Sequence, residues 1–358
     1  MRLKPYASGI VSFIPGVNRF CCTETGGTDS ARYCYSVWLR HLVMAARNAL
    51  DTDPQVVAEL GPGDSIGIGL AALMSGARKY YAFDVVKYVI LKRNLSIFDE
   101  IVNLFKNRTN IPGEREFPEA KPFLDNYEFP GHILTDNRLS AALEANRIAK
   151  VRQSILNPPD DESPIGYWAP WYEMSIIKRE SIDLIYSQAV LEHVDDLHNA
   201  YRAMRCWLRP GGYVSHQIDF TSHATADTWN GHWTYSECAW KLIRGRRPYL
   251  LNRQPHSIHI RILREEGFEI VCDKTMKSKS GIPRKRLARG FQNLSDDDLT
   301  TSAAFIQAIR RTDQNPRTAT PASVASMQTG RLCVARGNGM LDSGESLWRR
   351  IRRYGDGS

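Results

Sequence analysis

One short segment of the chain carries residues whose types and spacing suit the binding of adenosine. Glu59 lies at the end of an apolar run, Gly61 and Gly63 follow it, and Asp84 comes 21 residues after Gly63. The two glycines permit a tight turn and a close approach of the backbone to a ligand. An acidic residue about 20 residues after such a turn binds ribose hydroxyls in nucleotide-binding folds. We therefore predict that these residues form a nucleotide half-site.

The details of the turn indicate which adenosine-containing cofactor is bound. The dinucleotide fingerprint is G-x-G-x-x-G, and here one extra residue precedes the last glycine, Gly67. The carboxylate of Glu59 would repel a pyrophosphate, whereas it suits a ligand with an ammonium group and a sulfonium charge. A short-chain reductase needs a Tyr-x-x-x-Lys pair late in the sheet, but Tyr88 and Lys92 directly follow the second strand. We therefore expect S-adenosylmethionine as the cofactor.

A parallel sheet with crossover helices is needed to position these residues. We predict strands at apolar runs bounded by turn residues, namely 56–60, 79–83, 165–170, 182–186 and 213–218. Ser65 is expected to cap a helix from Ile66 to about Ser75, and a second helix spans 194–208 before a turn at 209–212. Because the carboxyl ends of parallel strands share one edge of a sheet, residues that follow each strand should lie close together.

The motifs E-L-G-P-G, D-L-I-Y-S-x-x-V-L-E-H-V and L-R-P-G-G-Y follow one another over roughly residues 55 to 310. This succession resembles the class I S-adenosylmethionine-dependent methyltransferases. The resemblance implies an α/β fold with a doubly wound, mostly parallel, seven-stranded Rossmann-like sheet, here with a helical insertion and an N-terminal helical arm. The segments 25–28, 249–257 and 266–269 are similar to bacterial methyltransferases of glycan and surface-polysaccharide loci, which implies O-methylation of a sugar, polysaccharide precursor or similar hydroxyl.

Other functions remain open at this stage. An N-methyltransferase or an RNA methyltransferase would share the same motifs. A non-catalytic binding protein of this fold is disfavoured by the intact glycine turn and its two acids, Glu59 and Asp84. The segment 223–253 is rich in aromatic residues that either bind a sugar ring or pack the loops.

The resemblance also indicates further residues that contact the cofactor. Trp168 and Ala169, at the end of the third strand, would meet the adenine, and Trp168 either stacks on that ring or packs within the insertion. Ser187 and Gln188 follow the fourth strand and would lie beside the sulfonium. Tyr33, on a helix predicted over 30–50, either contacts the methionine end or docks its helix on the sheet.

Three residues are candidates for catalysis. His193 follows the fourth strand and either removes an acceptor proton or fixes its loop. Asp219 follows the fifth strand and could orient His223 as a base. Glu192 and His193, with His216, Asp219 and His223 after the fifth strand, could also form a divalent-metal site, as in RNA 3′-end methyltransferases with an E-V-I-E-H pattern. That pattern is incomplete here, because Ala189 replaces its first glutamate. We therefore predict no bound metal.

Composition limits the choice of partners. The 358 residues carry a formal net charge of +8, concentrated at 274–289 and 348–353 without the interleaved aromatic residues of a nucleic-acid platform. We therefore expect that the protein does not bind nucleic acid. The two basic segments are either solvated loops or attract an anionic membrane or a lipid-linked substrate. No apolar run is long enough to cross a bilayer and the cysteines lack metal spacing, so we expect a cytoplasmic protein with reduced thiols. The sequence indicates no oligomeric state.

The predicted organisation has three parts. Residues 1–50 form an N-terminal arm and a cofactor-covering helix. Residues 51–311 form the methyltransferase domain, with an insertion at about 107–165. Residues 312–358 form a flexible basic tail.

Overall fold

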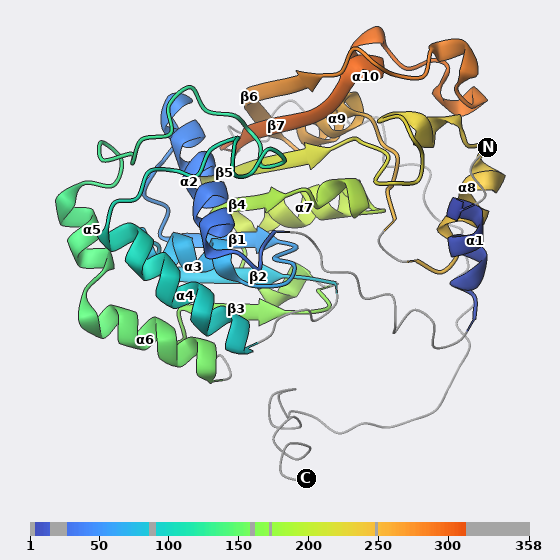
Figure 1. Cartoon of the computed structure of the whole chain (residues 1–358). Helices are drawn as coiled ribbons and strands as arrows, with labels where there is room; N and C mark the ends of the chain where they lie inside the picture. The colour runs from blue at the N-terminus through green and yellow to red at the C-terminus, as the bar shows by residue number, and fades with distance from the viewer. Residues whose placement is uncertain are drawn as a thin grey trace, which may run out of the picture. The chain divides into compact units, whose positions relative to one another are not determined.

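A seven-stranded sheet forms the centre of the computed structural model, which describes residues 4–14, 27–85, 91–157, 162–171, 174–247 and 250–312 (Figure 1). The strand order is β3-β2-β1-β4-β5-β7-β6. Strands β1 to β5 run parallel, and β7 runs antiparallel to both β5 and β6. The strand bounds are β1 Val56–Leu60, β2 Lys79–Phe83, β3 Ile165–Trp168, β4 Ile182–Gln188, β5 Leu208–Asp219, β6 Phe268–Lys277 and β7 Thr301–Arg310. This confirms the predicted doubly wound fold.

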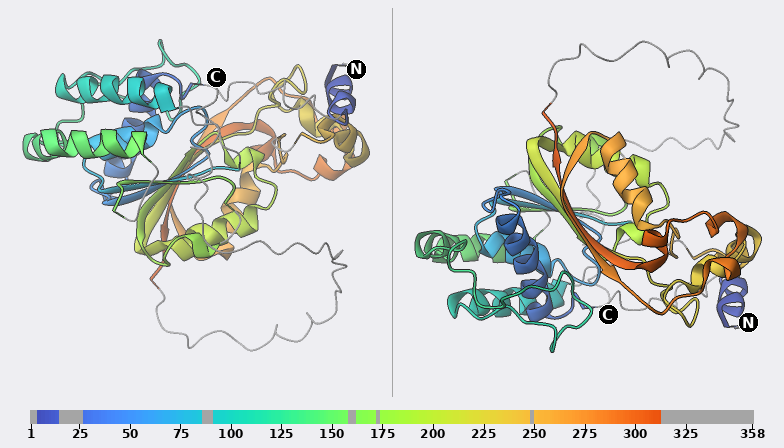
Figure 2. Two further views of the ribbon diagram at one scale, coloured as in Figure 1. Left: turned by 90° about the horizontal axis from the view of Figure 1, so that it is seen from below. Right: turned by 90° about the horizontal axis from the view of Figure 1, so that it is seen from above.

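Helices cover both faces of this sheet, as the two views of Figure 2 show. The first face is covered by α2 Ala31–Arg47, α3 Gly67–Met74, α4 Leu91–Lys106, α5 Asp136–Ala142 and α6 Ala145–Leu156. The second face is covered by α7 Leu197–Trp207 and α9 His256–Glu265. The remaining helices are α1 Lys4–Val11, α8 Glu237–Arg244 and α10 Asp296–Thr300. None of the helices in the described ranges has the length and hydropathy needed to span a membrane.

The helix after the glycine turn begins one residue later than predicted. Helix α3 starts at Gly67, and its N-cap residue, Ile66, makes no side-chain capping bond. The hydroxyl of Ser65 instead accepts a hydrogen bond from the Gly67 N–H at 3.0 Å and donates to the carbonyl of Thr28. Ser65 therefore links the helix start to the N-terminal arm.

Two other elements differ from the sequence-based expectation. The predicted turn at 209–212 is a bulge inside a longer β5, because Ile182 pairs with Leu208 whereas Leu184 pairs with Tyr213. The helical part of the insertion is divided in two, because α5 ends at Ala142 with Leu143 as its C-cap and α6 begins at Ala145 after its N-cap, Glu144. Both differences arise from local turns that leave the strand order unchanged.

One of the two basic segments falls outside the described residues. The predicted tail, 312–358, lies outside the described residues beyond Thr312, and the basic run at 348–353 lies there with it. The other basic segment, 274–289, begins within β6, continues past its end and carries exposed Lys285, Arg286 and Arg289.

Candidate functional site

The loops after β1 and β4 meet at the carboxyl edge of the sheet. Strand β1 is followed by α3 and β2 on one side, whereas β4 is followed by α7 and β5 on the other. A Cβ atom built on Gly61 would lie 2.7 Å from Cγ2 of Val190, so the two loops are in contact. Ligands of open α/β sheets bind at this kind of switch point. The glycine turn therefore lies at the expected place for a ligand.

The backbone of the glycine turn needs glycine. Gly61 and Gly63 have φ values of +64° and +71°, which residues with a Cβ rarely adopt. The N–H of Gly61 donates to the Phe83 carbonyl at 2.8 Å, which ties the turn to β2. The hydroxyl of Thr28 accepts from the Asp64 N–H at 3.0 Å. Thr28 of the arm thus holds the outer side of the turn.

Glu59 is buried at the end of β1. Its Oε2 accepts hydrogen bonds from the hydroxyls of Tyr80 at 2.5 Å and Tyr186 at 3.2 Å, and the residue is 1% exposed. Burial raises the pKa of the Glu59 carboxyl to about 8, against the opposing effect of the two hydroxyls. Burial therefore favours the neutral form of Glu59 near pH 7. The prediction from the sequence assumed an ionised carboxylate, and a nearby cation would favour that form.

Asp84 lies beside the end of β3, as the predicted adenosine site requires. Its N–H donates to the Trp168 carbonyl at 2.9 Å, and its side chain is 5% exposed. The indole of Trp168 lies against the rings of Tyr81 and Phe83, at centroid distances of 5.4 and 5.8 Å. Trp168 and Ala169 thus lie next to Asp84, although Trp168 already has aromatic partners within the protein.

The other predicted cofactor contacts have protein partners for their side chains. Tyr33 is buried with its ring edge-on to Phe117, at 5.4 Å between centroids. The hydroxyl of Ser187 shares a hydrogen bond of 2.8 Å with His216. The side-chain amide of Gln188 donates to the Lys121 carbonyl at 3.2 Å. Their roles toward a cofactor remain predictions.

The three residues predicted for catalysis are neighbours in the structure. The rings of His193 and His223 lie 5.0 Å apart between centroids, and Nε2 of His223 is 3.5 Å from Oδ2 of Asp219. The His223 imidazole and the N–H of Thr221 lower the pKa of the Asp219 carboxyl despite its burial. His223 has a positive φ of 42° in the loop after β5. The ends of β4 and β5 therefore bring together two imidazoles and a carboxylate.

Glu192 joins this cluster, as the metal-binding alternative considered from the sequence requires. One potential metal-binding atom from each of Glu192, His193 and His223 lies within 4.8 Å of those from the other two. Burial raises the pKa of the Glu192 carboxyl well above its usual range. Its adjacency to His193 in the sequence was the signal for that alternative.

Asn252 holds the turn that carries these residues. Its Nδ2 donates to the carbonyls of Leu191 and Val194, each at 2.8 Å, and its N–H donates to the Glu192 carbonyl at 2.7 Å. These three bonds fix both ends of the turn η3 Leu191–His193. The sequence named Asn252 only through the resemblance of its segment to other methyltransferases, and nothing in the local pattern indicated this contact.

One expectation for the region after β5 needs correction, and for most of its aromatic residues the packing alternative holds. His216 does not join Asp219 and His223, because it is fully buried on the face covered by α7 and burial lowers the pKa of its imidazole to about 3. Most aromatic residues of segment 223–253 pack the loops. Those that are buried include Trp233, Tyr235 and Trp240, whereas Trp229 is half-buried. Loop packing therefore accounts for most of this aromatic content.

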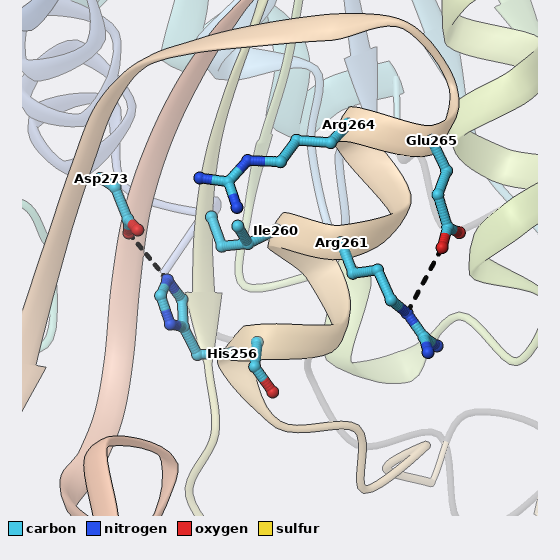
Figure 3. A pocket seen from close by; sticks show the side chains of 7 residues that line it. His256, Ile260, Arg261, Arg264, Glu265 and Asp273 are labelled. Atoms are coloured by element: carbon cyan, nitrogen blue, oxygen red, sulfur yellow. Dashed lines mark hydrogen bonds and ion pairs between the residues drawn. The ribbon is translucent and has the colours of Figure 1, made fainter. Parts of the chain in front are cut away.

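A separate pocket of about 360 Å³ lies between α9 and β6 (Figure 3). Nε2 of His256 lies 2.7 Å from Oδ1 of Asp273 on one side, and Arg261 pairs with Glu265 on the other. The pocket shares no residue with the cluster at the ends of β4 and β5. The pocket lies at the antiparallel edge of the sheet, away from the ends of the parallel strands where ligands of such sheets bind. The candidate catalytic residues are therefore not part of it.

Comparison with known proteins identifies related chains. The model of a methyltransferase domain family matches residues 38–273. An S-adenosylmethionine-dependent methyltransferase from Mesorhizobium loti is 14% identical over 75% of this chain and 98% of that chain, with a TM-score of 0.36. Haemonchus contortus phosphoethanolamine N-methyltransferase 2, in complex with S-adenosyl-L-methionine, is 15% identical over 85% of this chain and 61% of that chain, with a TM-score of 0.40. These structural similarities carry no argument about the acceptor, and no curated protein matches the sequence.

Proposed function

Because the chain belongs to the methyltransferase domain family and S-adenosylmethionine is its methyl donor, we propose that it methylates a hydroxyl of a sugar, a polysaccharide precursor or a similar small molecule. The observation that carries this proposal is the pairing of Asp219 with His223 beside His193. A hydroxyl keeps its proton at neutral pH, so its methylation benefits from positioned groups that help to remove that proton. Imidazoles oriented by a carboxylate are suited to this task.

The residues at the strand ends fit the donor. Asp84 offers a buried carboxylate for ribose hydroxyls where β2 ends, and the turn at Gly61 and Gly63 lets the backbone pass close to a ligand. When bound, S-adenosylmethionine supplies the methyl group and leaves as S-adenosylhomocysteine, with the electron pair of the broken carbon–sulfur bond on sulfur. The residues that we propose to hold it are Tyr33, Glu59, Gly61, Gly63, Asp84, Trp168, Ala169, Ser187 and Gln188.

The chain contributes most to the reaction by aligning the acceptor. Alignment of two reactants supplies up to about 7 to 11 kcal/mol, whereas a positioned base adds a factor of about 10² to 10⁴. Trp229 lies on the loop that also carries His223 and is half-buried. Its partly exposed ring supports a sugar-like acceptor, because an aromatic face packs well on the apolar face of a sugar ring.

Transfer of a labelled methyl group to matched acceptors tests this function. We expect O-methylated products from hexoses and lipid-linked glycans, identified by mass spectrometry, and no N-methylation of the matching amino sugars. His223→Ala should slow turnover by a factor of about 10² to 10⁴ and spare donor binding measured by calorimetry. Asp84→Ala should weaken donor binding by about 1 to 3 kcal/mol. Methylation confined to amines or to RNA would contradict the proposed acceptor class.

A further inference from the structure

The cluster at the ends of β4 and β5 has the composition of a metal site. Glu192, His193 and His223 each place a potential ligand atom within 4.8 Å of the others. Asp219 lies 3.5 Å from Nε2 of His223. Two imidazoles with one carboxylate are a common ligand set for divalent first-row transition cations. A carboxylate that holds one ring nitrogen of a histidine ligand is also typical of such sites.

The burial of the Glu192 carboxylate is an independent observation that points to a cation ligand. The residue is 3% exposed, and among the described residues no side chain donates a hydrogen bond to its carboxylate oxygens, which face only the backbone N–H groups of Glu192 and Asp219. A buried carboxylate without a partner costs free energy, so such groups are usually paired or bound to a metal. Glu192 is also one of the residues whose potential ligand atoms converge with those of His193 and His223. A cation at this point would satisfy it.

We propose that Glu192, His193 and His223 bind a divalent transition cation of the Mn²⁺, Fe²⁺ or Zn²⁺ class, and that Asp219 orients His223. His193 is half-buried and His223 is exposed, so part of the coordination sphere faces solvent and is open to an acceptor. Asn252 fixes the turn that carries Glu192 and His193. The expectation of no bound metal rested on the glutamate that Ala189 replaces, whereas His223 supplies a ligand atom from a different loop.

The role of the cation rests on the proposed function, whereas its binding does not. A cation bound here would hold the hydroxyl oxygen of the acceptor and lower the pKa of that hydroxyl, so that its proton passes to water. The oxygen electron pair would then form the bond to the methyl carbon. With the cation bound, His193 and His223 would act as its ligands instead of accepting the proton themselves, and Asp219 would orient His223. The cation would then supply the help in removing the proton that the proposed function requires.

Cation binding is tested on the full chain after EDTA treatment and dialysis. Mn²⁺ titration is followed by the loss of the free-ion signal in electron paramagnetic resonance, and Co²⁺ titration by its visible absorption. We expect Asp219→Asn to weaken Mn²⁺ binding by about 10- to 100-fold, and Glu192→Gln and His223→Ala to weaken it by at least as much. The matched control is His198→Ala, since His198 is an exposed histidine 3.7 and 4.0 Å from two glutamate carboxylates. It should bind as the unaltered protein does.

The outcomes separate this proposal from the proposed function. Absence of saturable Mn²⁺ and Co²⁺ binding by protein that still binds S-adenosylmethionine would overturn the cation site and leave the methyltransferase function standing. Equal weakening by His198→Ala would also overturn it, since binding would then be diffuse. Binding that only the cluster variants weaken supports the site, even if no hydroxyl acceptor is methylated. Circular dichroism of each variant verifies the fold, and His223→Ala, at an exposed position, carries the test if Glu192→Gln does not fold.

Discussion

At the scale of single residues, the buried carboxyl of Glu59 makes the stability of the protein depend on pH. Its carboxyl accepts hydrogen bonds from Tyr80 and Tyr186 inside the protein, and burial raises its pKa to about 8 from an ordinary value of 4.5. Between these two values the folded chain binds more protons at this site than the unfolded chain does. The free energy of unfolding contributed by Glu59 therefore falls as pH rises from about 4.5 to 8. A bound cationic ligand would oppose this effect by favouring the ionised form.

Thermal melting of the cofactor-free protein checks this dependence. Glu59→Gln keeps the size and an acceptor oxygen but cannot ionise. We expect the melting temperature of the unaltered protein, relative to that of Glu59→Gln, to fall steadily between pH 5 and pH 8. The control variant is Glu100→Gln, a change at an exposed glutamate of α4. The melting temperature of the unaltered protein relative to that of Glu100→Gln should show no such trend. Parallel curves for the unaltered protein and Glu59→Gln would show that Glu59 has an ordinary pKa.

At the scale of elements, the position of the candidate site depends on contacts between turns and residues that are distant in the sequence. The turn η3 is one example. The loop after α8 supplies Asn252, whose three bonds reach the backbone of Leu191, Glu192 and Val194. The glycine turn is held in a similar way by Thr28 of the arm. In both places a polar residue far away in sequence satisfies backbone groups that the turn leaves open, because buried carbonyls and N–H groups need partners.

Asn252→Asp separates positioning from chemistry. The aspartate keeps the oxygen that accepts from the Gln254 N–H, but it cannot donate to the carbonyls of Leu191 and Val194. We expect a loss of about 1 to 3 kcal/mol in stability and a lower kcat with an unchanged Kd for S-adenosylmethionine. Asn126→Asp, at an exposed position, is the control. A donor Kd that rises in proportion to the fall in kcat would argue against a positioning role.

At the scale of the whole molecule, the sequence predicted what depends on local patterns. Strands β1, β2 and β4 end at Leu60, Phe83 and Gln188, and their apolar runs could be recognised in the sequence. Because parallel strands end at the same edge of a sheet, the residues just after these runs could be placed together. Contacts between distant segments could not be predicted, because no local pattern encodes them. The hydroxyls that surround Glu59 come from two other strands. Asn252 reaches its turn from a different loop, and the bulge in β5 depends on pairing with β4.

The surface of the molecule gathers apolar side chains near its basic residues. Five large apolar residues of α1, the turn after it and α8 are between 42% and 59% exposed: Ile10, Val11, Phe13, Ile14 and Leu242. Helices α1 and α8 pack against each other (Figure 1), since a Cβ atom on Gly9 would lie 1.9 Å from the Leu242 carbonyl oxygen. The guanidinium of Arg246 lies 5.5 Å from the centre of the Phe13 ring. An apolar patch with basic neighbours is typical of helices that lie on anionic membranes.

We therefore expect the protein to sediment with vesicles that contain phosphatidylserine and to bind vesicles of phosphatidylcholine much less. Electrostatic attraction predicts weaker binding as salt is raised, because counterions screen the basic residues over about 10 Å at 0.1 M salt. Phe13→Asp places a negative charge in the patch and should abolish most of the binding. Leu156→Asp is the matched control, since Leu156 is 49% exposed on α6. If both variants lost binding equally, or if neutral vesicles bound as well, attachment would reflect general hydrophobicity instead of this face.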